Sequence, residues 1–446
     1  MTADAARGDP RLAEAARRLL GHLLAVSGLP VAVRLWDGSR VEPPDGSPAG
    51  TVAISGPGVL GAILARPSLD TLFRAYVTGG LEPVEGDLLR SFEAIATRKR
   101  GRRLRWRSLL AGFPWGTLVP LWRARTRIPA IGHALPEGER PAGSGRATDE
   151  TLIRFHYDVG NDFYALFLDP AMVYSCAYFR DPEGDLATAQ RDKLELVCRK
   201  LRLRPGLRLL DIGCGWGALL IHAARRHGIV GHGVTLSAAQ AELARARVAE
   251  AGLAGRVTIE LRDYRELSGT WDRIASIGMY EHVGIDRYPE YFRKIRDLLA
   301  EDGVFLNHGI TRRAKSGPRR FRRPSASRRI ILRYIFPGSD LDHIGHTLEV
   351  MEDAGFEIHD VEGLRRHYAR TCRLWYERLE AASAEAEHLV GVERTRMWRA
   401  YLAGVSVGFA QGPLRLFQVV ATRRGAAVLP WTRDDLYTGW PAGGGG

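Results

Sequence analysis

The most constraining feature of this sequence is an alternation of short apolar runs with longer amphipathic stretches between about residues 151 and 310. Short apolar runs bounded by turn residues predict buried strands, whereas the stretches between them have the length and spacing of helices. Strands that alternate with helices form a parallel sheet covered by helices, so we expect an α/β fold. The runs expected to form strands are 208–212, 231–236, 257–261, 273–277 and 303–307, with a further apolar candidate at 414–422.

The sequence on either side of this region changes in character. Before it, residues 10–26 have the periodicity of an amphipathic helix, and Asp37-Gly38 separates two short strand patterns, which is typical of a small α+β domain. The residues around 140 are rich in proline, glycine and polar side chains and predict a linker. We therefore expect an α+β domain at 1–130, a linker at 131–150, a main domain at 151–425 with a helical insertion at about 311–400, and a flexible tail at 426–446.

The net charge indicates the kind of partner. Lysine and arginine number 64, aspartate and glutamate number 51, and the difference is +13. Such a surplus favours a polyanionic partner, either nucleic acid or an anionic membrane surface. The charge is concentrated in two runs: seven of the ten residues at 98–107 are Lys or Arg, and 312–333 holds ten with no acid. Because the first run leads into a tryptophan-rich segment, we expect it to lie on an anionic membrane and the N-terminal domain to associate with lipid. We expect the second run either to lie on the membrane as well or to form a flexible loop over the active site.

The cysteine spacing and the hydropathy of the sequence indicate in which cellular compartment the protein works. The four cysteines show no C-x-x-C spacing, so neither a disulfide framework nor a metal site is expected, and a reducing cytoplasm fits best. No apolar run approaches the roughly 18 residues of a membrane span. We therefore expect a cytoplasmic protein that associates peripherally with a membrane. The cysteines are Cys176, Cys198, Cys214 and Cys372.

A glycine-rich turn follows the first strand of the main domain and opens a helix. Asp211 lies in the strand, and Gly213, Gly215 and Gly217 follow it. Glycines allow the backbone to bend sharply and to approach a ligand closely, and the helix N-terminus offers free N–H groups. A dinucleotide site requires the spacing G-x-G-x-x-G and an acid after the next strand, but residues 234–237 read Val-Thr-Leu-Ser. The form D-x-G-x-G-x-G resembles instead the first motif of class I S-adenosylmethionine-dependent methyltransferases.

Further motifs between residues 151 and about 420 resemble the cyclopropane-fatty-acyl-phospholipid synthase family. Residues 75–79 and 85–88 look like the extra N-terminal domain of its longer bacterial members. The resemblance implies a class I methyltransferase fold with a mostly parallel seven-stranded sheet, in addition to the small α+β domain. The motifs are 156–164, 174–179, 234–237 with Gln240, 263–265, 278–284 and 334–338.

The resemblance also implies an activity and a set of site residues. Family members transfer a methylene group from S-adenosylmethionine to a cis double bond in a phospholipid acyl chain, with a bound bicarbonate ion as base. The residues implied for the cofactor pocket are Tyr174, Ser175, Asp211, Gly213, Gly215, Gly217, Thr235, Leu236, Gln240, Asp263 and Tyr264. The residues implied for bicarbonate are Cys176, Glu281, His308, the backbone of Ile310, and Tyr376.

The chemistry of this reaction explains why such residues are needed. An alkene is a poor nucleophile, so the protein must align it with the sulfonium methyl group and exclude water. Methyl addition leaves a carbocation, and ring closure requires loss of a proton from the new methyl group. Glu281 could accept a hydrogen bond from the hydroxyl of bicarbonate, and His308 could donate one to its oxygens. The rings of Tyr174, Tyr178 and Tyr280 could stabilise the cation through their π-faces.

Several alternatives stay open. Some family members add the methyl group without closing a ring, which leaves a methylene group or, after reduction, a methyl branch, and others act on carrier-bound chains. A nucleic-acid methyltransferase is a remote alternative, because residues 279–282 read Met-Tyr-Glu-His where amino-directed enzymes usually carry Pro-Pro and an aromatic residue. Glu281 and His308 could also be purely structural. The family includes dimers, and a homodimer stays open.

Overall fold

A computed structural model describes residues 9–101, 110–131, 159–315, 321, 324–426 and 428–440. These residues form two compact units. The first unit consists of Met1–Glu137, Pro324–Ile335 and Ser383–Val407, and the second consists of Gly138–Arg323, Phe336–Ala382 and Gly408–Gly446.

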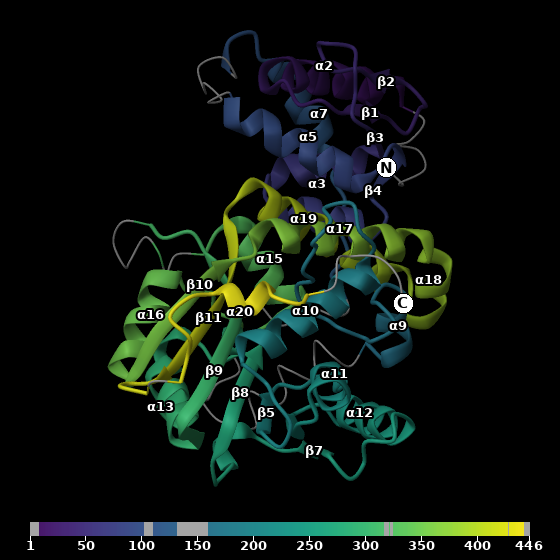
Figure 1. Cartoon of the computed structure of the whole chain (residues 1–446). Coiled ribbons are helices and arrows are strands. Elements are labelled where there is room, and N and C mark those ends of the chain that lie inside the picture. The colour runs from purple at the N-terminus through teal and green to yellow at the C-terminus, as the bar shows by residue number, and fades with distance from the viewer. Residues whose placement is uncertain are drawn as a thin grey trace. The chain divides into compact units, whose positions relative to one another are not determined.

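The second unit is built on a seven-stranded sheet with the order β10-β11-β9-β8-β5-β6-β7 (Figure 1). The pairs from β9 to β7 are parallel, and β11 runs antiparallel to both β9 and β10. The predicted α/β class and mostly parallel sheet are therefore confirmed. The strands are β5 (Arg208–Ile212), β6 (Val230–Thr235), β7 (Val257–Leu261), β8 (Trp271–Ile277), β9 (Leu299–Arg312), β10 (Phe356–Gly363) and β11 (Leu414–Arg423).

Helices cover both faces of this sheet. Successive side chains of a strand point to opposite faces, so Leu209 belongs to a core cluster with α10, α11 and α12, and Leu210 to a cluster with α13 and α16. This alternation produces three layers with two separate apolar cores. The helices of this unit are α9 (Asn161–Ala165), α10 (Leu186–Lys200), α11 (Ala218–His227), α12 (Ala238–Glu250), η2 (Tyr264–Glu266), η3 (Tyr280–His282), η4 (Ile285–Arg287), α13 (Tyr288–Leu298), α16 (Ile344–Asp353), α17 (Arg365–Ala381) and α20 (Asp434–Tyr437).

The first unit is an α+β structure, as the sequence predicts. Its four-stranded sheet has the order β2-β1-β3-β4, and the apolar face of its first helix packs with Leu60 and Leu121 in a core of its own. The strands are β1 (Ala32–Arg34), β2 (Arg40–Val41), β3 (Thr51–Ile54) and β4 (Leu81–Glu85). The helices are α2 (Pro10–Ser27), α3 (Pro57–Ala65), α4 (Leu69–Val77), α5 (Leu88–Gly101), η1 (Trp115–Thr117), α7 (Leu118–Arg123), α15 (Ala326–Tyr334), α18 (Ser383–Val390) and most of α19 (Val392–Gln411).

Two segments that the sequence assigns to the main domain lie in the first unit. The Tyr334 hydroxyl on α15 donates to Oδ1 of Asp70 at 3.0 Å, and its ring lies 5.1 Å from that of Phe73. On α19, Arg396 forms an ion pair of 2.6 Å with Glu82 of β4. These contacts join residues about 260 to 320 positions apart, which local sequence patterns do not reveal.

Part of the segment 426–446, which the sequence predicts as a flexible tail, forms a short helix with side-chain contacts to the rest of the second unit. Residues 434–437 form α20, and Leu436 is buried. Arg202 forms a bidentate ion pair with Asp435, at 2.8 and 3.1 Å, and the guanidinium of Arg199 lies 4.9 Å from the centre of the Trp440 ring. The buried Leu436 and the contacts with Arg199 and Arg202 hold this segment in place. The glycine-rich end of the sequence does not indicate these contacts. Among the described residues, no helix combines the length and apolarity that crossing a bilayer requires.

Candidate active site

The glycine turn after β5 has the backbone geometry that a close approach to a ligand requires. Gly213, Gly215 and Gly217 have φ values of +81°, +54° and +81°, in the left-handed region that favours glycine. The N–H groups of Gly213 and Cys214 donate to the carbonyl of Val234 at 2.9 and 3.0 Å, which ties the turn to β6. The turn ends at Gly217, the N-cap of α11, so the backbone rather than side chains shapes this part of the site.

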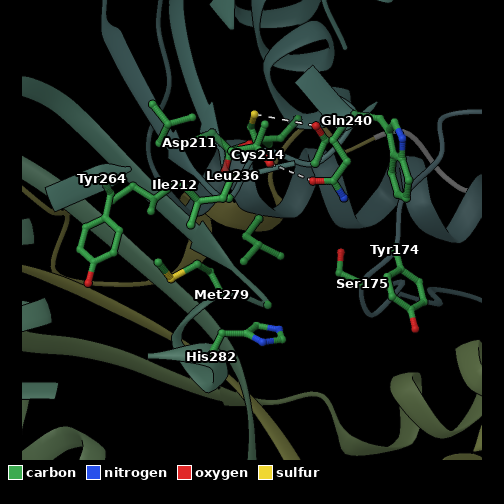
Figure 2. A pocket seen from close by; sticks show the side chains of 18 of the residues that line it. Tyr174, Ser175, Asp211, Ile212, Cys214, Leu236, Gln240, Tyr264, Met279 and His282 are labelled. Atoms are coloured by element: carbon green, nitrogen blue, oxygen red, sulfur yellow. Dashed lines mark hydrogen bonds between the residues drawn. The ribbon is translucent and has the colours of Figure 1, made fainter. Parts of the chain in front are cut away.

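A pocket opens beside this turn, at the carboxyl ends of β5, β6 and β8. Ten of the eleven residues predicted for the cofactor line it, and Gly217, the N-cap of α11, does not. Figure 2 shows Tyr264 and Met279 on one side of the pocket and Tyr174 and Ser175 on the other. Open α/β sheets bind their ligands at this edge.

Asp211 presents an unused acceptor to this pocket. Its side chain is buried, Oδ1 has no hydrogen-bond partner among the described residues, and burial raises the pKa of the carboxyl group to about 7. A buried carboxylate without a partner is costly, and a cationic ligand would remove that cost. The ammonium group of S-adenosylmethionine has the charge and donors that this position requires, so the pocket fits the cofactor.

The other predicted cofactor residues divide into two kinds. Thr235 and Gln240 are preorganised: the Thr235 hydroxyl donates to Oε1 of Gln240 at 2.9 Å, beside the pocket. Asp263 is engaged with its own neighbour, since its carboxylate accepts from the backbone N–H of Arg265 at 2.9 Å and from that guanidinium at 2.5 Å. Asp263 therefore fixes the turn that carries Tyr264, and the turn places the tyrosine at the pocket.

Lys193 is a site residue that the sequence did not reveal. It lines the pocket from α10, is fully buried, and its Nζ donates to the Ser175 hydroxyl at 3.0 Å. Burial lowers the pKa of its ammonium group to about 8, although Asp169 and Asp211 oppose the shift. A single lysine in an amphipathic helix normally lies on the solvent side, so no local pattern distinguishes it.

Glu281 and His308, together called the Glu281–His308 group, are both buried near the end of β8: Glu281 lies in η3, just after the strand, and His308 pairs with its last residue, Ile277. Oε1 of Glu281 accepts the backbone N–H of Ile310 at 2.6 Å, and Nδ1 of His308 lies 3.1 Å from Nε2 of Gln418. The remaining atoms, Oε2 of Glu281 and Nε2 of His308, are buried and have no partner in the described part of the chain. Burial raises the pKa of Glu281 to about 7 and holds the pKa of His308 well below its usual value.

β9 is longer than predicted, which changes the position of His308. The strand continues to Arg312, so His308 lies within it, paired with Ile277 of β8 and with Gln418 of β11. The sequence had placed His308 beyond the strand end. The longer strand is held by β11, which accompanies it along its whole second half.

Cys176 and Tyr376 are also buried, and helix α17 links the segments of the chain that carry them. The N–H of Ala177 donates to the Thr371 hydroxyl of α17 at 3.1 Å, and Tyr376 lies on the same helix. Burial raises the pKa of the Cys176 thiol, so Cys176 is a neutral thiol and not an activated nucleophile. The positive charge of Lys193 acts in opposite directions on the two groups: it favours the thiolate of Cys176 and, together with burial and Lys200, lowers the pKa of His308.

The structure thus separates the predicted site into two regions. None of the five residues predicted for bicarbonate lines the cofactor pocket. Of the three tyrosines, Tyr174 lines the pocket, whereas Tyr178 stacks on His367 with ring centres 4.8 Å apart, and Tyr280 stacks on Tyr288 at 5.1 Å.

The strand order, the glycine turn with three left-handed residues and the pocket at the carboxyl ends of the strands define a class I S-adenosylmethionine-dependent methyltransferase. Residues 145–419 match the model of the mycolic acid cyclopropane synthetase family. The chain belongs to this family.

Relatives in sequence and structure agree with this assignment. A probable fatty acid methyltransferase of Pseudomonas putida is 38% identical over 421 residues, which cover 92% of this chain and 96% of the relative. The cyclopropane-fatty-acyl-phospholipid synthase of Escherichia coli K12 is 38% identical over 271 residues, 60% of this chain and 66% of the relative. The solved cyclopropane synthase MmaA2 of Mycobacterium tuberculosis is 34% identical with a TM-score of 0.58, over 61% of this chain and 98% of that structure.

Proposed function

We propose that this enzyme transfers the methyl group of S-adenosylmethionine to the cis double bond of an unsaturated acyl chain in a membrane phospholipid, and that loss of a proton then closes a cyclopropane ring. The names of the relatives in Pseudomonas putida and Escherichia coli support a fatty acyl substrate. One observation supports the ring-closing step: Oε2 of Glu281 and Nε2 of His308, which lies in β9, are buried and have no hydrogen-bond partner in the part of the chain that the structure describes.

The electron balance of the reaction defines what the site must do. The π electrons of the alkene form a new C–C bond to the methyl carbon as the C–S bond breaks, which leaves a carbocation and a neutral thioether. When the methyl group then loses a proton, the electrons of its C–H bond form the second ring bond. When a hydride first shifts from the methylated carbon to the cationic carbon, loss of a methyl proton forms a C=C bond to that carbon, and the product is an exomethylene chain instead.

The two orphaned atoms are a donor and an acceptor. The amide Nε2 of Gln418 can only donate, so Nδ1 of His308 accepts, and the proton of the neutral imidazole lies on Nε2, where it can be donated. Oε2 of Glu281 accepts. Such a pair, together with a buried thiol, can hold a small anion that has one hydroxyl group; a bound bicarbonate ion would supply the base that takes the proton.

A specific observation favours the branched-chain alternative. The relatives that match along almost the whole chain, in Pseudomonas putida and Mycobacterium tuberculosis, are named probable fatty acid methyltransferases, whereas the cyclopropane synthase of Escherichia coli matches over 60% of it. The decisive experiment is expression in a bacterium that lacks its own cyclopropane synthase, followed by mass spectrometry of the fatty acid methyl esters. We expect acyl chains extended by one CH₂ unit in a ring. An exomethylene or methyl-branched chain supports the alternative, and unmodified lipid contradicts both.

We further propose that the first unit docks on an anionic phospholipid bilayer. The side chains of the basic run 98–107 lie outside the described residues, but the segment that follows it is described. Trp115, Val119 and Trp122 recur at helical spacing along η1 and α7, and each exposes about half of its surface or more. The guanidinium of Arg125 lies 3.5 Å from the centre of the Trp122 ring. Exposed tryptophans beside cations are typical of a membrane-interface element.

The docking proposal is tested with vesicles. We expect the double variant Trp115→Ser and Trp122→Ser to sediment less with vesicles of anionic unsaturated phospholipid at low salt. Replacing the fully exposed Trp431 of the second unit is the matched control and should leave sedimentation unchanged. Equal binding of all three proteins contradicts the proposal.

A further inference from the structure

Cys198, His222 and His227 lie together where helices α10 and α11 pack against each other. The ligand-capable atoms of these three side chains all lie within 4.8 Å of one another. Cys198 belongs to α10, whereas both histidines belong to α11. None of these residues lines the cofactor pocket.

Glu195 completes the group. It lies one turn before Cys198 on α10, and its Oε2 is 3.1 Å from Nε2 of His222 and 3.1 Å from Nε2 of His227. In a tetrahedral zinc site with bonds of about 2.0 to 2.1 Å, neighbouring nitrogen and oxygen ligands lie about 3.3 Å apart. The two distances from Glu195 to the histidines are therefore close to the edges of such a site, and the ligand-capable atoms of Cys198, His222 and His227 lie within 4.8 Å of one another.

The surroundings match the requirements of a divalent cation. Nε of Arg199 donates to the other carboxylate oxygen of Glu195 at 2.7 Å, which orients Oε2 toward the histidines as outer-shell partners orient metal ligands. The thiol of Cys198 is fully buried, while both histidines and Glu195 are partly exposed, so an ion has a path from solvent. A thiolate and a carboxylate together balance the two charges of the ion.

We propose that Cys198, His222, His227 and Glu195 form a structural binding site for Zn²⁺. Thiolate and imidazole ligands select zinc over magnesium or calcium, and four protein ligands leave no open position for catalysis. The ion links α10, which carries Lys193, to α11, which begins at the glycine turn. It therefore clamps together two walls of the cofactor pocket.

Cobalt titration of the tag-free, full-length protein tests this site. After treatment with a chelator, we expect one equivalent of Co²⁺ to bind with the visible bands of tetrahedral cobalt and a near-ultraviolet thiolate charge-transfer band, and Zn²⁺ to displace it. We expect Cys198→Ser to lose the thiolate band and His222→Gln to weaken binding by more than about 100-fold, beyond the loss seen for outer-shell partners. Cys372→Ser replaces another buried free cysteine and should keep the wild-type spectrum.

The outcomes separate a metal site from a network of ion pairs. Absence of saturable cobalt binding to the wild-type protein, or a charge-transfer band that survives in Cys198→Ser, overturns the proposal. If Cys198→Ser does not fold, His227→Gln decides, because this partly exposed side chain lies at the end of α11. Zn²⁺ should raise the unfolding temperature of the wild-type protein and not that of His227→Gln.

Discussion

The cofactor pocket and the Glu281–His308 group are built in opposite ways. In the pocket, three glycines with positive φ let the backbone approach a ligand, and the pocket is open to solvent. At the Glu281–His308 group, Glu281 of η3 accepts the N–H of Ile310 in β9 and His308 of β9 meets Gln418 of β11, while Oε2 of Glu281 and Nε2 of His308 have no partner among the described residues. A backbone site tolerates changes in neighbouring side chains, whereas a buried polar group depends on every partner. The two regions should therefore respond differently to substitution.

The largest effect is expected from Glu281→Gln and His308→Ala. Each variant removes an atom that would hold the base, and loss of general-base catalysis typically costs about 10² to 10⁴ in turnover. Binding of S-adenosylmethionine, measured by calorimetry, should stay within about twofold of the wild-type value, because neither residue lines the pocket. Glu357→Gln and His359→Gln on β10 serve as matched controls with normal turnover. Loss of cofactor binding in both active-site variants would show that the two regions form a single site.

A glycine in each region sharpens the contrast. At Gly213, an alanine would be strained by φ of +81° and would contact Met279 at 3.2 Å, so Gly213→Ala should weaken cofactor binding by about 1–3 kcal/mol. At Gly309, φ is ordinary, but a Cβ would overlap the Tyr280 ring.

Gly309→Ala should therefore lower the free energy of unfolding by about 1–3 kcal/mol through overpacking. Gly255→Ala meets no neighbour and is the control for both variants. Calorimetry and urea unfolding measure the two quantities. An equal effect of both substitutions on cofactor affinity would contradict the separation.

The pH dependence of stability gives the smallest expected effect. Burial raises the pKa of Glu281 from its ordinary value of 4.5 to about 7, so the folded state binds the proton more tightly than the unfolded state. The resulting stabilisation is complete below about pH 4 and is lost as pH rises through 7. Glu281→Gln should remove this part of the pH dependence, at most about 3 kcal/mol, in urea unfolding curves recorded from pH 4 to 8. The contribution of Asp211, whose pKa is also raised to about 7, should remain. A pH profile of the variant that matches the wild-type profile would contradict the burial of an ionisable Glu281.

Local patterns determined the central sheet and the cofactor turn. The strands at 208–212 and 257–261 have the predicted bounds, because each is a short apolar run ended by polar residues. The glycine turn was predictable for the same reason, since its function depends on residues adjacent in the chain. Ten of the eleven residues predicted for the cofactor from such motifs line the pocket.

Only the tertiary structure decided which distant side chains meet. The packing of α10 against the sheet buries Lys193 beside Ser175, and the pairing of β9 with β11 gives His308 its partner Gln418. The sequence predicted no metal site, because its cysteines lack paired spacing, yet the packing of α10 on α11 brings Cys198 to His222 and His227. Hydrophobic periodicity specifies which face of an element is buried, but not which polar residue on a neighbouring element it will meet. That choice is made when the layers pack.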